Sequence, residues 1–151
     1  MTTVTQSSKA INWRPAVLGA LIFAGIIAAT AAWARPADLN LSLDRVGDQS
    51  VCRVRIQSRE NPIPLSQMHQ WTIHVANTEG LPVAGAVIAV DGGMPEHGHG
   101  LPTAPRVTAA GLPGDYLISG MKFSMTGWWV LKLAIASPDG HSDHITFNIV
   151  L

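Results

Sequence analysis

Residues 129–151 read WVLKLAIASPDGHSDHITFNIVL, a stretch with two alternating runs of apolar and polar or small side chains around one polar turn. Alternation with a period of two predicts β-strands that each bury one face. The segment SPDGHSD between the runs is rich in the residues that turns favour. The apolar positions are Trp129, Leu131, Leu133 and Ile135 in the first run and Ile145, Phe147, Ile149 and Leu151 in the second.

The same pattern recurs upstream of this stretch. Strands are predicted around Cys52 and Trp71 and over residues 39–46, 86–91 and 115–119. The run 86–91, AVIAVD, is almost wholly apolar and is therefore expected to be a central strand. Gly and Pro punctuate the boundaries between these segments, and nothing after residue 34 has a helical period.

About seven short antiparallel strands in about 115 residues predict an all-β domain, an antiparallel β-sandwich of the immunoglobulin-like kind. Cys52 is the only cysteine in the chain, so the domain has no internal disulfide and must be stabilised by its core. Because Cys52 alternates with apolar residues in its strand pattern, we expect its thiol to pack in that core.

The N-terminal segment has a different character. Residues 16–33 read AVLGALIFAGIIAATAAW without a charge, and Lys9 and Arg14 precede them. Such a stretch is typical of a single transmembrane helix or of a long signal-peptide core. We expect residues 1–15 to be cytoplasmic, residues 16–34 to form a retained anchor or uncleaved signal, and residues 35–151 to be exported. The predicted location is the cytoplasmic (inner) membrane, single-pass, with the domain in the periplasm. Cleavage after the Ala-Trp-Ala sequence at 32–34 is the alternative.

The charge balance limits the partners. Ten basic and ten acidic side chains cancel, and only 13% of the residues are charged, so the sequence lacks the basic footprint of a nucleic-acid-binding protein. No nucleophile-elbow pattern, Ser/His/Asp set or carboxylate pair is apparent from the spacing, and we predict that the protein is not an enzyme.

A loop with coordinating side chains follows the strand at 86–91. Residues 92–105 read GGMPEHGHGLPTAP, in which Pro residues restrict the backbone. His97 and His99 lie two residues apart, so both imidazoles face one point if the backbone is extended. Met94 adds a thioether. Imidazole and thioether together suit copper, as Cu(I) or Cu(II), whereas Glu96 leaves zinc as an alternative. We expect these residues to lie outside the strand core.

Other residues give weaker signals. In GMKFSMTGWW at 120–129, the side chains of Met121, Phe123 and Met125 share one side if the segment is extended. Core packing is one interpretation, and Met125 as a further copper ligand is the other. The predicted metal ligands are therefore Met94, His97, His99 and Met125. The alternative for the two histidines is hydrogen bonding of the imidazoles to backbone carbonyls.

Strand parity predicts which way the side chains of the remaining histidines and of Trp128 point. His69 shares parity with Trp71 and opens its strand, whereas His74 has the opposite parity. His141 in the turn and His144 on the outward face are expected to be solvated. Trp129 faces the core, which leaves Trp128 pointing outward.

The motifs together resemble a family of exported bacterial domains, the YtkA-like/FixH-like group. The matching elements are Met94-Pro95 with His97 and His99, Gly114 with Tyr116, and Phe123, Met125, Gly127 and Trp129. The resemblance extends over residues 61–135. It implies a membrane-tethered or exported β-sandwich with a link to copper handling or respiratory-oxidase assembly, and hence a possible protein partner in copper delivery or oxidase assembly. A metal-free module that assists assembly of a membrane complex is the alternative.

Overall fold

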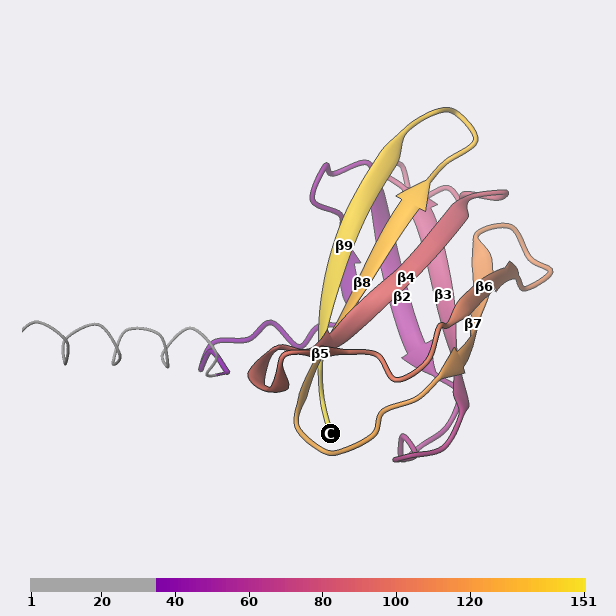
Figure 1. The fold of residues 1–151 in the computed structure, drawn as a ribbon. Coiled ribbons are helices and arrows are strands. Elements are labelled where there is room, and N and C mark those ends of the chain that lie inside the picture. Colours follow the sequence, from indigo (N-terminus) through magenta and orange to yellow (C-terminus); the bar gives the residue numbers. More distant parts are fainter. Residues whose placement is uncertain (1–34) are drawn as a thin grey trace, which may run out of the picture. The chain divides into compact units, whose positions relative to one another are not determined.

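The computed structural model describes residues 35–151 (Figure 1). The predicted cytoplasmic segment and the predicted anchor, at 1–15 and 16–34, lie outside the described residues. Within 35–151, no helix has the length and hydrophobicity that crossing a membrane requires.

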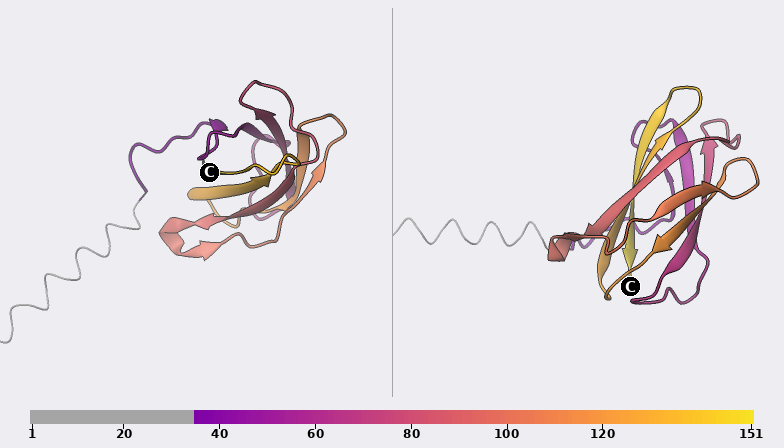
Figure 2. Two further views of the ribbon diagram at one scale, coloured as in Figure 1. Left: turned by 90° about the horizontal axis from the view of Figure 1, so that it is seen from above. Right: turned by 45° about the vertical axis from the view of Figure 1, so that its right-hand side comes forward.

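The described chain folds into two antiparallel sheets, which confirms the prediction of an all-β sandwich. One sheet has five strands in the order β1-β2-β3-β7-β6, and the other has four in the order β5-β4-β8-β9. The elements are β1 (Asp44–Val46), β2 (Cys52–Ser58), β3 (His69–Asn77), β4 (Val87–Met94), η1 (Pro95–His97), β5 (His99–Gly100), β6 (Arg106–Ala109), β7 (Asp115–Met121), β8 (Trp128–Ala136) and β9 (Ser142–Val150). Figure 2 shows the sheets from two further directions.

The core lies between the sheets and consists of the residues that the alternation assigned to it. In β8 and β9 the predicted apolar positions from Trp129 to Ile149 are buried, and the register pairs Trp129 with Ile149 and Leu133 with Ile145. Burying one large apolar side chain contributes about 1.5–3 kcal/mol, so this hairpin and its partners in β2, β3 and β7 provide much of the stability. The largest fully buried side chains are Trp71, Trp129, Phe123 and Phe147.

Two strand predictions were wrong in detail. Only Asp44–Val46 of the predicted strand at 39–46 is extended and paired. The run at 86–91 is not central, because β4 pairs along its length with β8 alone and meets the two-residue β5 only at Gly93 and Met94. The side chain of Val87 is 74% exposed. Small and β-branched residues are compatible with an outward-facing strand surface as well as with a buried one. The apolar run therefore did not distinguish a strand with one partner from a central strand.

Asp143, near the start of β9, organises the end of the sandwich at the β8–β9 turn. Its carboxylate is buried and accepts hydrogen bonds from the backbone N–H groups of Gln49, Val51, Cys52 and His144, at 2.8–3.2 Å. Burial by itself would raise the pKa of Asp143, but these four donors outweigh it and hold the pKa below its usual value. Gly47 also packs here, and a Cβ at that position would lie 2.2 Å from Asp143 Oδ2.

Cys52 is buried in the same region, as the sequence predicted. Its Sγ lies 3.8 Å from Asp143 Oδ2. Burial, followed by the negative charge of Asp143, raises the pKa of the thiol to about 11. The thiol is therefore protonated and poorly nucleophilic at neutral pH.

Candidate metal centre

The loop at 92–105 is more regular than the sequence suggested. Strand β4 continues through Gly92 and Gly93 to Met94, η1 follows, and Gly98 adopts a left-handed conformation with φ of 65° before β5 pairs back on β4. The backbone at the histidines is not extended, because the chain turns tightly between them. This turn requires Gly98, since other residues rarely adopt positive φ.

The turn nevertheless brings the two imidazoles together. The ring centroids of His97 and His99 are 5.9 Å apart, and both side chains are exposed. His99 Nδ1 lies 3.0 Å from the carbonyl oxygen of Gly100 and donates to it. Hydrogen bonding of an imidazole to a backbone carbonyl, the alternative interpretation, therefore holds for Nδ1 of His99. The other nitrogen, Nε2, keeps its lone pair, which is the usual arrangement in metal-binding histidines.

Met94 lies inside the core rather than in an exposed loop, which contradicts the expected position. Its side chain is 1% exposed because β4 continues the inward parity of Ile88 and Val90 through Gly92 to this residue. Its Cε packs against Gly127, where a Cβ would approach it to 2.7 Å. Met94 thus pairs with His99 through the strand register and contributes to core packing.

Trp129 connects the predicted ligands. Its indole lies edge-on to the His99 ring at 5.7 Å, and its Nε1 donates to the carbonyl oxygen of Met125 at 3.0 Å. The side chain of Met125 is 41% exposed, whereas Met121 and Phe123 are fully buried. Core packing is therefore the correct interpretation for Met121 and Phe123, and the Met125 thioether is accessible to a ligand.

All four methionines of the described residues gather at this end of the sandwich. Met68 precedes β3, Met94 ends β4, Met121 ends β7, and Met125 lies in the connection from β7 to β8. These strand ends meet on the side opposite the β8–β9 turn (Figure 1). We call it the β5 end. No group of three or more His, Cys, Asp or Glu side chains that could hold a metal occurs within residues 35–151, so a metal site at this end depends on thioethers.

The other histidines divide between the two ends. His69 starts β3 at the β5 end and is buried. A register shift separates it from Trp71 in the pairing with β7, yet the two residues keep the shared parity that the sequence indicated. His141 and His144 lie at the β8–β9 end and are exposed, as expected. His74 is also exposed and pairs with Asp115 at 2.6 Å.

A hollow of about 490 Å³ extends from the metal candidate over the outer face of the four-stranded sheet. Its lining includes Met94, His99 and Trp128, with Asp91 and Lys132 farther along. Trp128 points outward, as predicted, and its Nε1 donates to Asn148 Oδ1 at 3.0 Å. The indole is thus fixed beside His99 as a wall of the candidate site.

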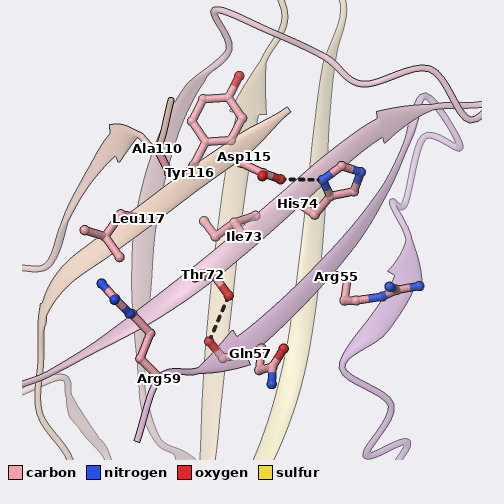
Figure 3. A pocket seen from close by; sticks show the side chains of 10 residues that line it. All are labelled: Arg55, Gln57, Arg59, Thr72, Ile73, His74, Ala110, Asp115, Tyr116 and Leu117. Carbon is pink, nitrogen blue, oxygen red and sulfur yellow. Dashed lines mark hydrogen bonds and ion pairs between the residues drawn. The ribbon is translucent and has the colours of Figure 1, made fainter. Parts of the chain in front are cut away.

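A second hollow lies on the outer face of the five-stranded sheet (Figure 3). It measures about 570 Å³, and the His74–Asp115 pair lies at its edge. Arg55, which also lines it, is paired with Asp44 at 2.8 Å. None of the predicted metal ligands lies in this hollow.

Comparisons with known proteins agree with this architecture. Residues 48–134, more than half of the chain, match the family model described as YtkA-like. No curated protein matches the sequence. A crystal structure of a DUF4426 family protein from Pseudomonas aeruginosa PAO1 is similar, with 12% sequence identity and a TM-score of 0.53 over 72% of this chain and 94% of that chain. The ZirS C-terminal domain gives 10% identity and a TM-score of 0.41 over 97% and 88%. The first likeness concerns the fold alone.

Proposed function

We propose that this chain, which belongs to the YtkA-like family, is a membrane-anchored periplasmic copper-binding protein that acts in copper handling or in the maturation of a respiratory complex. In this proposal residues 16–34 anchor the chain in the inner membrane and residues 35–151 form an exported immunoglobulin-like sandwich. The protein binds and passes the metal without catalysing a reaction.

The observation that carries the proposal is the convergence of imidazoles and thioethers at the β5 end. His97 and His99 are exposed and adjacent, and Met125 is exposed on the neighbouring connection. Imidazole is a good ligand for both copper oxidation states, and thioether favours Cu(I). The same end contains every methionine of the described residues, although methionines used only for packing have no reason to avoid the other end.

Each predicted ligand has a distinct role in this site. His97 and His99 hold the ion through ring nitrogens that carry no proton, so acidification weakens binding because protons compete with the metal. Met125 adds a soft ligand from the side of Trp129. Met94 is the buried register partner of His99, and its thioether favours Cu(I) if the η1 turn admits the ion to that depth.

Copper titration of the purified full-length chain tests the proposal. We expect the double variant His97→Ala/His99→Ala to lose at least about 100-fold in affinity for Cu(I) and Cu(II), since two of the few ligands disappear. The matched control is His141→Ala/His144→Ala, which removes two exposed histidines from the β8–β9 end of the sandwich. It should change copper affinity less than threefold. Equal affinity in both double variants would reject the site.

A metal-free interaction module is the second candidate, and Trp128 favours it. The indole is half-buried on an outer sheet face, where it serves no core function, and it lines the 490 Å³ hollow. Aromatic side chains in such positions are common anchors at protein interfaces. If the copper titration shows no binding, the test is purification of each chain from its native membrane. Co-purification of a membrane complex with the wild-type chain but not with Trp128→Ala would support the interaction module.

A further inference from the structure

His69 has a buried nitrogen that the fold does not use. The side chain is 3% exposed at the start of β3. Nδ1 lies 3.1 Å from the carbonyl oxygen of Gln67, so Nδ1 carries the proton and donates. Nε2 is then an acceptor with a free lone pair, and within the described residues it has no hydrogen-bond partner. Buried polar atoms are normally paired, and an exception in a native fold requires an explanation.

The surroundings of this imidazole are soft and apolar. Met121 is the direct partner of His69 in the pairing of β3 with β7 and is fully buried. Side chains opposite each other in an antiparallel pair have Cβ atoms about 4.5–5.5 Å apart, so the His69 and Met121 side chains start from neighbouring positions. The Phe123 ring lies 5.2 Å from the imidazole, and Trp71 lies at 6.5 Å. The indole Nε1 of Trp71 also lacks a partner, but it is a donor only and cannot bind a cation.

The segment that precedes β3 is joined to the segment that follows β7. Ser66 N donates to the carbonyl oxygen of Phe123 at 2.7 Å, and Ser66 Oγ donates to that of Ser124 at 3.1 Å. Leu65 forms an isolated bridge with Phe123. Two irregular segments, next in the chain to His69 and Met121, are thus held together by two hydrogen bonds and one bridge.

We propose that His69 Nε2 and the Met121 thioether bind a monovalent soft metal ion, Cu(I), at a second site that is separate from His97 and His99. A neutral imidazole and a neutral thioether form a ligand set suited to Cu(I). Their lack of charge matters, because burying an ion is costly and the cost is smaller for one positive charge than for two. The site therefore excludes Cu(II) and Zn(II). This inference depends on the proposed function only for the choice of copper among soft ions.

The test uses the full-length chain with ¹³C-labelled methionine methyl groups in the His97→Ala/His99→Ala background, with Ag(I) as a diamagnetic probe and Cu(I) as the metal. We expect one equivalent to bind and to shift the Met121 methyl signal and the ¹⁵N signal of His69 Nε2. Met121→Leu keeps the volume but removes sulfur, and it should weaken binding at least tenfold. The control Met68→Leu removes an exposed thioether at the same end and should leave binding unchanged.

The outcomes separate the two proposals. If the wild type binds copper but the histidine double variant shows no shift at Met121 or His69, the buried site is wrong and the exposed site stands. Unchanged affinity in Met121→Leu also overturns the buried site. If neither protein binds Cu(I), both proposals fail. The ¹⁵N shift of His69 is recorded without altering the core, so the test does not depend on the folding of Met121→Leu.

Discussion

The two ends of the sandwich treat a buried polar side chain in opposite ways. At the β8–β9 end, Asp143 accepts four backbone hydrogen bonds, and its charge is matched by the dipoles around it. At the β5 end, His69 is buried equally well but keeps one nitrogen without a partner. Full satisfaction rigidifies a region, whereas an unpaired ligand atom costs stability that only a function can justify. Within the described residues, the buried carboxylate at one end is therefore fully satisfied by the fold, whereas the buried imidazole at the other end keeps a free acceptor.

The most disruptive change should be Asp143→Ala. It leaves four backbone donors without their acceptor, and each buried donor left unpaired costs about 1–3 kcal/mol. Since some of these groups can reach water, we expect a loss of about 3–5 kcal/mol in the free energy of unfolding, measured by urea denaturation. The control is Asp139→Ala in the exposed turn, which should stay within about 0.5 kcal/mol of wild type. A loss below 1 kcal/mol for Asp143→Ala would remove the contrast between the ends.

Met94 tests whether the β5 end also contributes to stability. Truncation by Met94→Ala removes a fully buried side chain next to Gly127 and should cost about 2–4 kcal/mol. Met94→Leu preserves volume and should cost less than about 1.5 kcal/mol. Urea denaturation of both variants separates packing from sulfur chemistry. If Met94→Ala is as stable as wild type, the Met94 side chain does not contribute to the core.

Acid should weaken the β8–β9 end first. The pKa of Asp143 is lower in the folded state than in the unfolded chain, so the carboxylate stabilises the fold above about pH 4, the ordinary range of the group. This stability is lost as the pH falls from there through the folded pKa. Asp44 contributes with the same sign, because hydrogen bonds from Arg53 and Arg55 lower its pKa.

The check is the urea midpoint of wild type and Asp143→Asn between pH 6 and pH 3. Wild type should lose more stability over this interval than the variant, because asparagine has no proton to gain. Asp44→Asn provides the comparison for an exposed carboxylate. Parallel curves for wild type and Asp143→Asn would show that the carboxylate makes no pH-dependent contribution.

The smallest effect is expected from His141→Ala/His144→Ala. Both side chains are exposed, and the one ion pair that either forms with a carboxylate within residues 35–151, His141 with Asp139 at 3.2 Å, is solvent-screened. The free energy of unfolding should change by less than about 0.5 kcal/mol. A thermal denaturation scan is sufficient, and a larger loss would mean that this pair is unsuitable as a copper control.

Parity alone predicted most of the fold. The alternation at Cys52, Trp71 and Trp129 gave strands whose inward residues are buried, because a two-residue period leaves only two choices of face. The lateral order of the strands was beyond this reasoning. The run at 86–91 shows why, since an apolar strand next to a sheet edge and one in the middle have the same composition.

The candidate site was only partly predictable. The His97–Gly98–His99 spacing indicated two adjacent imidazoles, and the rings are adjacent, although a left-handed glycine rather than an extended strand brings them together. The burial of Met94 was accessible from the sequence, because its parity continues that of Ile88 and Val90. The unpaired nitrogen of His69 was not, since hydrogen-bond satisfaction depends on which distant segments meet in the fold.

The environment of Cys52 determines which chemistry a metal would encounter in this chain. A free thiolate binds soft metals more strongly than a thioether, and together with copper it undergoes oxidation. Burial and Asp143 disfavour both, because they raise the pKa of the thiol to about 11 and keep it protonated at neutral pH. The chain's one thiol is thereby kept protonated, at the end of the sandwich away from the methionines. A soft ion would meet the neutral imidazoles and thioethers of the β5 end instead, in keeping with the reversible copper binding that we propose.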